Sequence, residues 1–228
     1  MTNRENNLCF LLIIRYTLCI FRVLKNELII KHGVMIVSIS GAQCTGKTTL
    51  IEALKKERCL EGSLFMGSPS RKGNDRGIKI NKEAGIYDQL WIATSYVKEI
   101  IESAMLPHDH IISDRCLLDV LCYTEYNRDR SSSEDKPLWD EMVDTVTQLL
   151  FHIEPLYSHH IILRPEFKIV DDGVRSTDEV FQKEIDRLFE KNARMLQDFA
   201  PRGIHYVSGS IDERVSQVLD IMEFNYRL

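Results

Sequence analysis

The feature that most constrains this chain is a loop that begins at Gly41. Residues 41–48 read GAQCTGKT, which matches the phosphate-loop pattern G-x-x-x-x-G-K-[ST]. An apolar, β-prone run, MIVSIS, comes directly before the loop, and a stretch with helical spacing follows it. Glycines allow the tight turn in which backbone N–H groups and a helix N-terminus face phosphate oxygens. The pattern therefore predicts a nucleoside triphosphate site, but it does not tell what happens to the γ-phosphate.

The loop supplies most of the residues that we expect to hold a nucleotide. Lys47 is expected to contact the β- and γ-phosphates, and the Thr48 hydroxyl is expected to ligate Mg²⁺. Cys44 occupies a variable position of the pattern, and we interpret it as a small side chain that fits there rather than a redox switch. The loop residues predicted to bind ATP are Gly41, Ala42, Gln43, Cys44, Thr45, Gly46, Lys47, Thr48 and Thr49.

Beyond the loop, short apolar runs alternate with amphipathic stretches. We predict further strands within 61–66, before Asp114, at 159–164 and within 204–210. Helical periodicity predicts helices at 48–60, 86–105, 117–126, 138–152, 178–199 and 211–224. The polar stretches predict loops at 68–85, which has room for a helical turn, at 127–137 and at 166–180. This alternation predicts a three-layer α/β domain with a mainly parallel sheet.

Length and charge narrow the class of protein. A chain of 228 residues is long enough for one domain with a sizeable core. Its formal charge is −5, so the protein lacks the net positive charge that would attract a polyanion, and nucleic acid is not the expected partner. The six cysteines include no C-x-x-C pair, a pattern that suits reduced thiols in the cytoplasm.

The first 34 residues carry an apolar run and precede the first predicted strand of the domain. The apolar run LCFLLII at 8–14 is followed by Arg15 and Arg22, so no uncharged stretch approaches the length that spans a bilayer. Because Met35 supplies an initiator followed at once by a buried strand, we predict that residues 1–34 are an extension outside the core. The domain would then run over 35–228. A packing or membrane-associating helix is the alternative for the extension.

A charged pair follows the predicted strand that ends at Asp114. Ligands of open α/β sheets bind outside the carboxyl ends of the strands, which places Asp114 and Arg115 beside the phosphate loop. Asp114 is a candidate for the Mg²⁺ shell or for accepting a proton from an attacking hydroxyl, and Arg115 for clamping a phosphate. Asp119 follows on the next helix, where it either faces the same site or caps the helix.

Two polar loops carry the remaining candidates. Arg175, in DDGVRS at 171–176, is a candidate lid residue that covers the transferring phosphoryl group. Arg71, Arg76 and Lys79 are candidates for binding the acceptor. Taken singly, each of these residues also fits a solvated surface charge.

Four segments together resemble the P-loop kinase superfamily: SGAQCTGKTTLIEAL, SDRCLLDVLCYTEY, LRPEFKIVDDGVRSTDEVFQKEIDRLF and VSGSIDERVSQVL. Within it the chain looks like the small AAA-type ATP-binding domains of phages and bacteria. These are similar to nicotinamide riboside kinases and to thymidylate or deoxynucleoside kinases.

The resemblance implies a P-loop NTPase fold whose parallel five-stranded sheet has the order 2-3-1-4-5, with ATP and Mg²⁺ as donor. It makes Asp114 the candidate base, with Arg115 its neighbouring arginine and Arg175 a lid arginine. It also places the turn Ser208, Gly209 and Ser210 near the adenine. Cys116 stands where those kinases carry Ser or Thr.

The function predicted from these features is ATP-dependent phosphoryl transfer to a small molecule, with a nucleoside or nucleoside monophosphate as the leading acceptor. One alternative is an ATP-binding or hydrolysing switch that acts with a protein partner. Another is a kinase of polynucleotide ends or modified bases. The sequence leaves the oligomeric state open, a homo-oligomer included.

Overall fold

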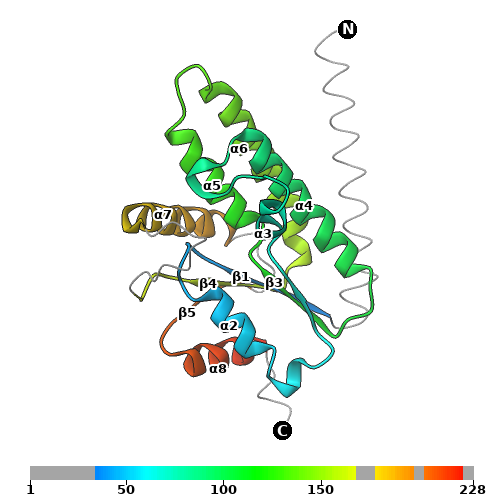
Figure 1. Ribbon diagram of the computed structural model, residues 1–228. Coiled ribbons are helices and arrows are strands. Elements are labelled where there is room, and N and C mark those ends of the chain that lie inside the picture. The colour runs from blue at the N-terminus through cyan, green and yellow to red at the C-terminus, as the bar shows by residue number, and fades with distance from the viewer. Residues whose placement is uncertain (1–33, 168–177, 198–202, 223–228) are drawn as a thin grey trace.

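The computed structural model describes residues 34–167, 178–197 and 203–222, and its centre is a five-stranded parallel sheet (Figure 1). The strands are β1 (Met35–Ser40), β2 (Leu64–Met66), β3 (His110–Asp114), β4 (His159–Leu163) and β5 (Ile204–Val207). Their order across the sheet is β2-β3-β1-β4-β5. The predicted three-layer α/β fold and the predicted strand order are therefore confirmed.

The central strand β1 shows why short apolar runs form this sheet. Ile36 packs into the hydrophobic cluster on one face, while Val37 and Ile39 pack into the cluster on the other. Strands of a parallel sheet are covered on both faces, so both sets of side chains must be apolar or satisfied. Ile39 pairs with Asp114 of β3 in the parallel register, which brings the carboxyl ends of β1 and β3 to one edge.

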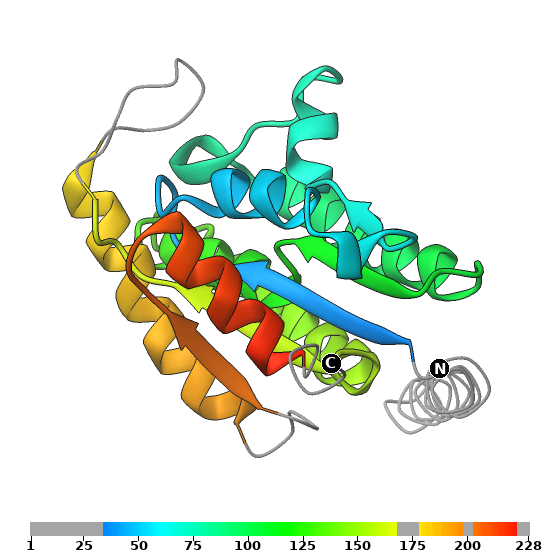
Figure 2. The ribbon, with the colours of Figure 1, turned by 90° about the horizontal axis from the view of Figure 1, so that it is seen from below.

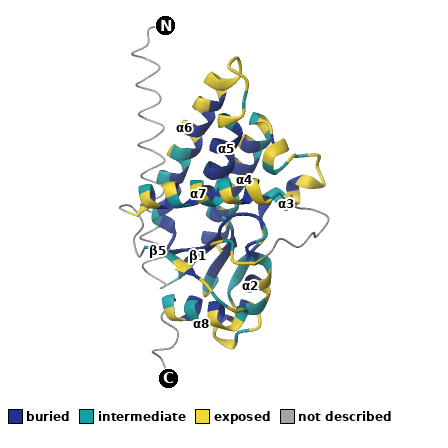
Figure 3. Cartoon of the chain, turned by 90° about the vertical axis from the view of Figure 1, so that its left-hand side faces the viewer, coloured by how far each residue is buried: buried dark blue, intermediate teal, exposed yellow. Residues whose placement is uncertain are grey.

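Helices cover the two faces of the sheet unequally. On one face lie α4 (Ile86–Ala104), α5 (Leu117–Asp129), α6 (Lys136–Ile153) and α7 (Glu179–Leu196), and on the other α2 (Lys47–Leu54) and α8 (Ile211–Ile221). Figure 2 shows α2 and α8 lying over the sheet from below. The helix α5 is enclosed by its neighbours, and Figure 3 shows it mostly buried, with exposed residues at the far tip of the α5 and α6 pair and on the outer faces of other helices.

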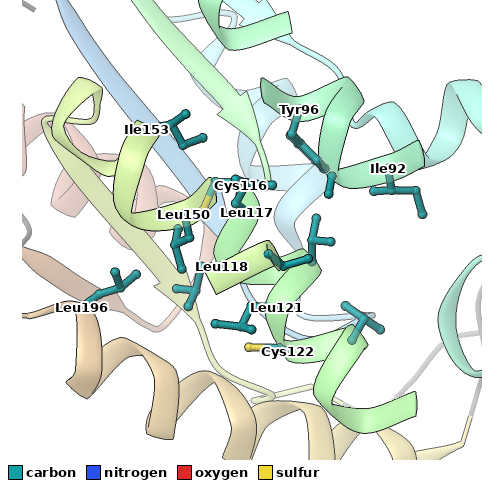
Figure 4. Close-up of a cluster of buried hydrophobic side chains, with 14 of the residues drawn as sticks. Ile92, Tyr96, Cys116, Leu117, Leu118, Leu121, Cys122, Leu150, Ile153 and Leu196 are labelled. Carbon is teal, nitrogen blue, oxygen red and sulfur yellow. The ribbon is translucent and has the colours of Figure 1, made fainter. Parts of the chain in front are cut away.

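The larger core lies around α5. Figure 4 shows Leu118 and Leu121 of this helix close to Leu150 of α6 and Leu196 at the end of α7. Residues 117–127 of α5 are all buried, so the helix is a core element rather than an amphipathic surface helix. Its position fixes the residues at its N-terminus against the carboxyl edge of the sheet.

Several element boundaries differ from the prediction. The helix α2 ends at Leu54, before a 3-10 turn at Arg58–Leu60, rather than at residue 60. The loop predicted at 68–85 contains a helix, α3 (Pro69–Asn74), which begins with a proline that suits the first helical turn. The loop predicted at 127–137 is shorter, because α5 continues to Asp129 and α6 begins at Lys136.

Two predictions fall on residues that the structure does not describe. These are the extension at 1–34, of which only residue 34 is described, and the lid loop at 171–176 with Arg175. Among the described residues, none of the helices combines the length and the hydrophobicity that crossing a membrane would need.

Candidate active site

The phosphate loop joins β1 to α2 and has a backbone that only certain residues tolerate. Gly41 has φ 137°, and a Cβ atom there would lie 2.3 Å from the carbonyl oxygen of Leu163 on β4. Gly46 also has a positive φ, of 86°. Cys44 adopts φ 58°, a left-handed conformation that is uncommon outside glycine. The glycines of the motif are thus required by the turn and by the close approach of β4.

Side chains from distant elements hold the carbonyl groups of this loop. Lys47 donates from Nζ to the carbonyl oxygen of Gly41 at 2.7 Å and to that of Ala42. Gln182 of α7 donates to the Gln43 carbonyl at 2.7 Å, and Arg214 of α8 donates to the Thr45 carbonyl at 2.8 Å. A loop fixed through its carbonyls is pre-shaped to present backbone N–H groups to an anion. The predicted contact of Lys47 with phosphate stays a prediction.

Arg214 is a site residue that the sequence analysis missed. Its guanidinium is 2% exposed and also donates to the Gly209 carbonyl at 3.0 Å. It therefore joins the phosphate loop to the turn of Ser208, Gly209 and Ser210. Ser210 caps α8 by accepting from the Glu213 N–H. The turn thus lies beside the phosphate loop, and its contact with adenine stays a prediction.

An exposed aromatic ring accompanies this junction. Phe167 is 52% exposed, and its ring centroid lies 4.7 Å from the Arg214 guanidinium carbon. A Cβ atom on Gly46 would lie 4.0 Å from the Phe167 ring, so the ring borders the phosphate loop. Phe167 belongs to no run of helical or strand periodicity that would have singled it out in the sequence.

The predicted pair at the end of β3 lies at the same edge. Arg115 has φ 75°, and its NH1 donates to Oδ1 of Asp119 at 3.2 Å. Asp119 also accepts the Cys116 N–H at 3.1 Å, so it caps α5 and faces Arg115 at once. Burial raises the pKa of the Asp119 carboxyl, while the nearby charges of Arg115 and Lys47 partly offset that effect. Asp114 itself is buried at the strand end.

A cavity of about 240 Å³ opens between the phosphate loop and the helices α3, α4 and α5. Gln43, Arg71, Gln89, Arg115, Asp119 and Tyr123 are among the residues that line it. Asp119, rather than Asp114, therefore contributes the acidic side chain to its wall. Arg76 lines a separate hollow between β2 and α4. It lies beyond the end of α3, whereas Arg71 lies within that helix, and the two arginines line different hollows.

The predicted Mg²⁺ ligands are chemically suited to that ion. Thr48 offers a hydroxyl and Asp114 a carboxylate, and Mg²⁺ is usually bound by a few such oxygen atoms together with phosphates and water. In this structure the Thr48 hydroxyl accepts a hydrogen bond of 2.7 Å from Arg71. Arg71 thus bridges from this cavity to the phosphate loop.

The parallel sheet in 2-3-1-4-5 order, with a phosphate loop after its central strand, defines a P-loop kinase-like fold. A family model described as an AAA domain matches residues 36–214, so the chain belongs to that AAA domain family. A sequence comparison with curated proteins gives no significant match.

Solved structures share the fold at low sequence identity. A NadR protein in complex with NR has a TM-score of 0.64 and 16% identity, covering 84% of this chain and 51% of its own. The chain therefore spans about half the length of that protein. A deoxyadenosine kinase from M. mycoides, with dCMP and dCDP bound, has a TM-score of 0.61 and 17% identity over 83% of this chain and 100% of its own.

A thymidylate kinase from Ehrlichia chaffeensis has a TM-score of 0.53 and 17% identity over 83% of this chain and 98% of its own. At these identities the likeness establishes the fold.

Proposed function

We propose that the protein is a cytoplasmic ATP-dependent phosphotransferase whose acceptor is a small molecule, with nucleosides and nucleoside monophosphates as the leading class. The observation that carries this proposal is the cavity beside the phosphate loop. Gln43 belongs to the loop and also lines the cavity, so a ligand in the cavity would lie next to the phosphates of ATP. A kinase must hold donor and acceptor in contact, and positioning supplies much of its rate enhancement. The described cysteines are free thiols, in keeping with a reducing compartment.

The walls of the cavity favour a nucleoside-like acceptor. Asn74, Asn81 and Gln89 bring side-chain amides, which offer both donors and acceptors to the edge of a base. Ile92 and Tyr96 add apolar and aromatic surface. Most ligand pockets combine such apolar walls with a few convergent polar groups.

On the donor side, the phosphates of ATP would lie on the phosphate loop, with the base near Phe167 and the turn at 208–210. A purine can stack on the Phe167 ring, because both the purine and the phenyl ring have flat apolar faces. Mg²⁺, held by Thr48 and Asp114, would neutralise charge on the β- and γ-phosphate oxygens.

The roles of the remaining charged side chains in phosphoryl transfer follow from the sign of their charges. Asp114 does not line the cavity but directly precedes Arg115, which does, and from the end of β3 it would accept or orient the proton of the attacking hydroxyl. Arg115, oriented by Asp119, together with Lys47 and Arg71, would balance the negative charge on the transferring group. Arg175 is the proposed lid arginine, and it lies outside the described residues.

A direct assay tests the proposal. The purified full chain with Mg²⁺ and ATP is incubated with nucleosides, nucleoside monophosphates and nicotinamide riboside, and phosphorylated products are identified by mass spectrometry. We expect one class of acceptor to gain phosphate. Asp114→Asn should lower kcat about a hundredfold or more, because proton-transfer groups typically contribute that much. ATP binding and thermal unfolding of this variant report whether the fold is kept.

The other outcomes separate the alternatives. ATP hydrolysis without transfer to any acceptor would contradict the proposal and favour a switch that acts with a protein partner. Transfer to DNA or RNA ends that falls steeply with added salt would instead favour a polynucleotide kinase.

A further inference from the structure

The side chain of Gln43 has a use that the phosphate loop itself does not require. Phosphate is bound in such loops by backbone N–H groups and by the lysine, so the side chain at a variable position is free for other contacts. The Gln43 side chain is almost fully buried and lines the acceptor-side cavity together with Arg115 and Asp119. It therefore lies where the donor and acceptor sites meet.

The protein holds this amide in one orientation. Tyr123 of α5 donates its hydroxyl hydrogen to Oε1 of Gln43 at 3.1 Å. The backbone carbonyl of the same residue accepts from Gln182 at 2.7 Å. Tyr123 is fixed in turn by edge contact with Phe181, at a centroid distance of 5.9 Å. Both oxygen atoms of Gln43 are thus engaged, each by a side chain from a different helix.

The amide nitrogen of Gln43 is left without such a partner. Among the described residues, Nε2 is buried and makes no hydrogen bond. A buried donor without an acceptor costs free energy, and a ligand that supplies an oxygen recovers that cost. The arrangement is therefore complete only when an oxygen atom reaches Nε2.

We propose that the Gln43 side chain determines acceptor specificity by donating a hydrogen bond from Nε2 to an oxygen on the reacting end of the acceptor. Tyr123 is the positioning residue that orients the amide. This inference rests on the proposed function, and it adds that a residue of the ATP-binding loop recognises the acceptor rather than ATP. The oxygen belongs either to a hydroxyl of a nucleoside or to the phosphate of a monophosphate.

The test compares Gln43→Leu with wild type on the acceptor that wild type phosphorylates. We expect kcat/KM for the acceptor to fall about tenfold, the effect of losing one hydrogen bond to a site built for it. The affinity for ATP should stay within about twofold, because backbone groups bind its phosphates. Tyr123→Phe should give a smaller loss in the same parameter. Gln148→Leu, an exposed change on α6, is the matched control and should leave both constants unchanged.

Gln43→Glu distinguishes the two sources of the oxygen. A carboxylate accepts a hydrogen bond from a nucleoside hydroxyl but repels a phosphate. A small loss on a nucleoside acceptor identifies the hydroxyl, and a loss of about a hundredfold or more on a monophosphate identifies the phosphate. If Gln43→Leu fails to fold, kcat/KM for the acceptor in Gln43→Glu and Tyr123→Phe tests the inference instead.

Two results would overturn the inference while leaving the proposed kinase intact. One is an unchanged kcat/KM for the acceptor in Gln43→Leu when wild type transfers phosphate. The other is an equal loss of ATP affinity, which would place the role of Gln43 in the shape of the loop. If wild type transfers phosphate to nothing, the proposed function fails first.

Discussion

At the scale of single residues, Arg214 shows how one buried charge can hold a site together. Its guanidinium donates to the Thr45 and Gly209 carbonyls and lies 3.2 Å from a carboxylate oxygen of Glu166. A buried arginine is tolerated only when its donors are satisfied, since its desolvation is costly. These partners come from three separate segments, so the side chain couples the geometry of the phosphate loop to the turn before α8.

Replacing this arginine should therefore harm stability and binding together. We expect Arg214→Met to lower the free energy of unfolding by about 3 kcal/mol, because it leaves the Thr45 and Gly209 carbonyls without the arginine donor and removes the positive charge beside Glu166. ATP affinity should fall by more than about tenfold. Urea denaturation and calorimetric titration with ATP measure the two effects. Arg194→Met removes an arginine that is 74% exposed and should change stability by less than about 0.5 kcal/mol. Equal effects of the two substitutions would refute this account of Arg214.

The phosphate loop and Arg214 show which parts of the site can be predicted from the sequence and which cannot. The phosphate loop was predictable because its chemistry is local and its glycines are required by the backbone. Arg214 was missed although it follows Ile211 by three residues and precedes Val218 by four, a spacing that places it on the apolar face of its helix. Its role was hidden because its partner in the phosphate loop, Thr45, is 169 residues away in the chain.

At the scale of elements, a polar layer lies between the sheet and the helices that cover it. His160 of β4 bonds the Ser38 hydroxyl of β1 at 2.8 Å, and its Nε2 lies 3.9 Å from Glu154. Burial alone would lower the pKa of His160, but the Cys116 thiol and the Glu154 carboxylate outweigh burial and raise the pKa to about 9. The folded protein thus holds this proton more tightly than the unfolded chain.

This shift predicts a pH dependence of stability. The contribution of His160 is fully present below its ordinary pKa of 6.5 and is lost as the pH rises to about 9. We expect the free energy of unfolding to fall by on the order of 3 kcal/mol over that window. The double variant His160→Gln with Glu154→Gln keeps the layer neutral and should lack this fall. Urea denaturation across the window measures it, and an identical slope in both proteins would rule out the pair as its cause.

Element boundaries were less predictable than element types, for a physical reason. Periodicity of apolar residues is local and marks a strand or helix wherever it occurs. The end of α5 depends instead on Asn127, which donates to the carbonyls of Asn81 and Ala84. Its start at Leu117 agrees with the prediction, because the capping of Cys116 by Asp119 is a local bond between residues three positions apart. The long-range bonds of Asn127 leave no such spacing in the sequence.

At the scale of the whole molecule, the candidate active site arises where four segments meet. The phosphate loop, α3, α4 and α5 line one cavity although they are spread over about 80 residues of sequence. The topology of the sheet and the position of the loop were predictable, and they locate the edge at which a ligand binds. Part of the cavity lining was predicted, because the site candidates named from the sequence include Gln43, Arg71, Arg115 and Asp119. The lining residues of α4 were not predicted, because their place in the wall is set by how α3 and α4 pack and not by a motif.

The same topology predicts where the folding unit begins. The central strand β1 starts at Met35, and its two neighbours, β3 and β4, follow it in the chain. The helices α2 and α8 cover one face of the sheet, and α4, α5, α6 and α7 cover the other. All of these elements lie after residue 34. A chain that starts at Met35 is therefore expected to fold and to bind ATP like the full chain.

Thermal unfolding and ATP titration of residues 35–228 beside the full chain test this expectation. The melting temperature should agree within about 2 °C, which corresponds to less than about 1 kcal/mol for a domain of this size. The affinity for ATP should agree within about twofold. A large drop in melting temperature would mean that residues 1–34 bury apolar surface of the domain. A loss of ATP affinity at an unchanged melting temperature would mean that they act on the phosphate loop instead.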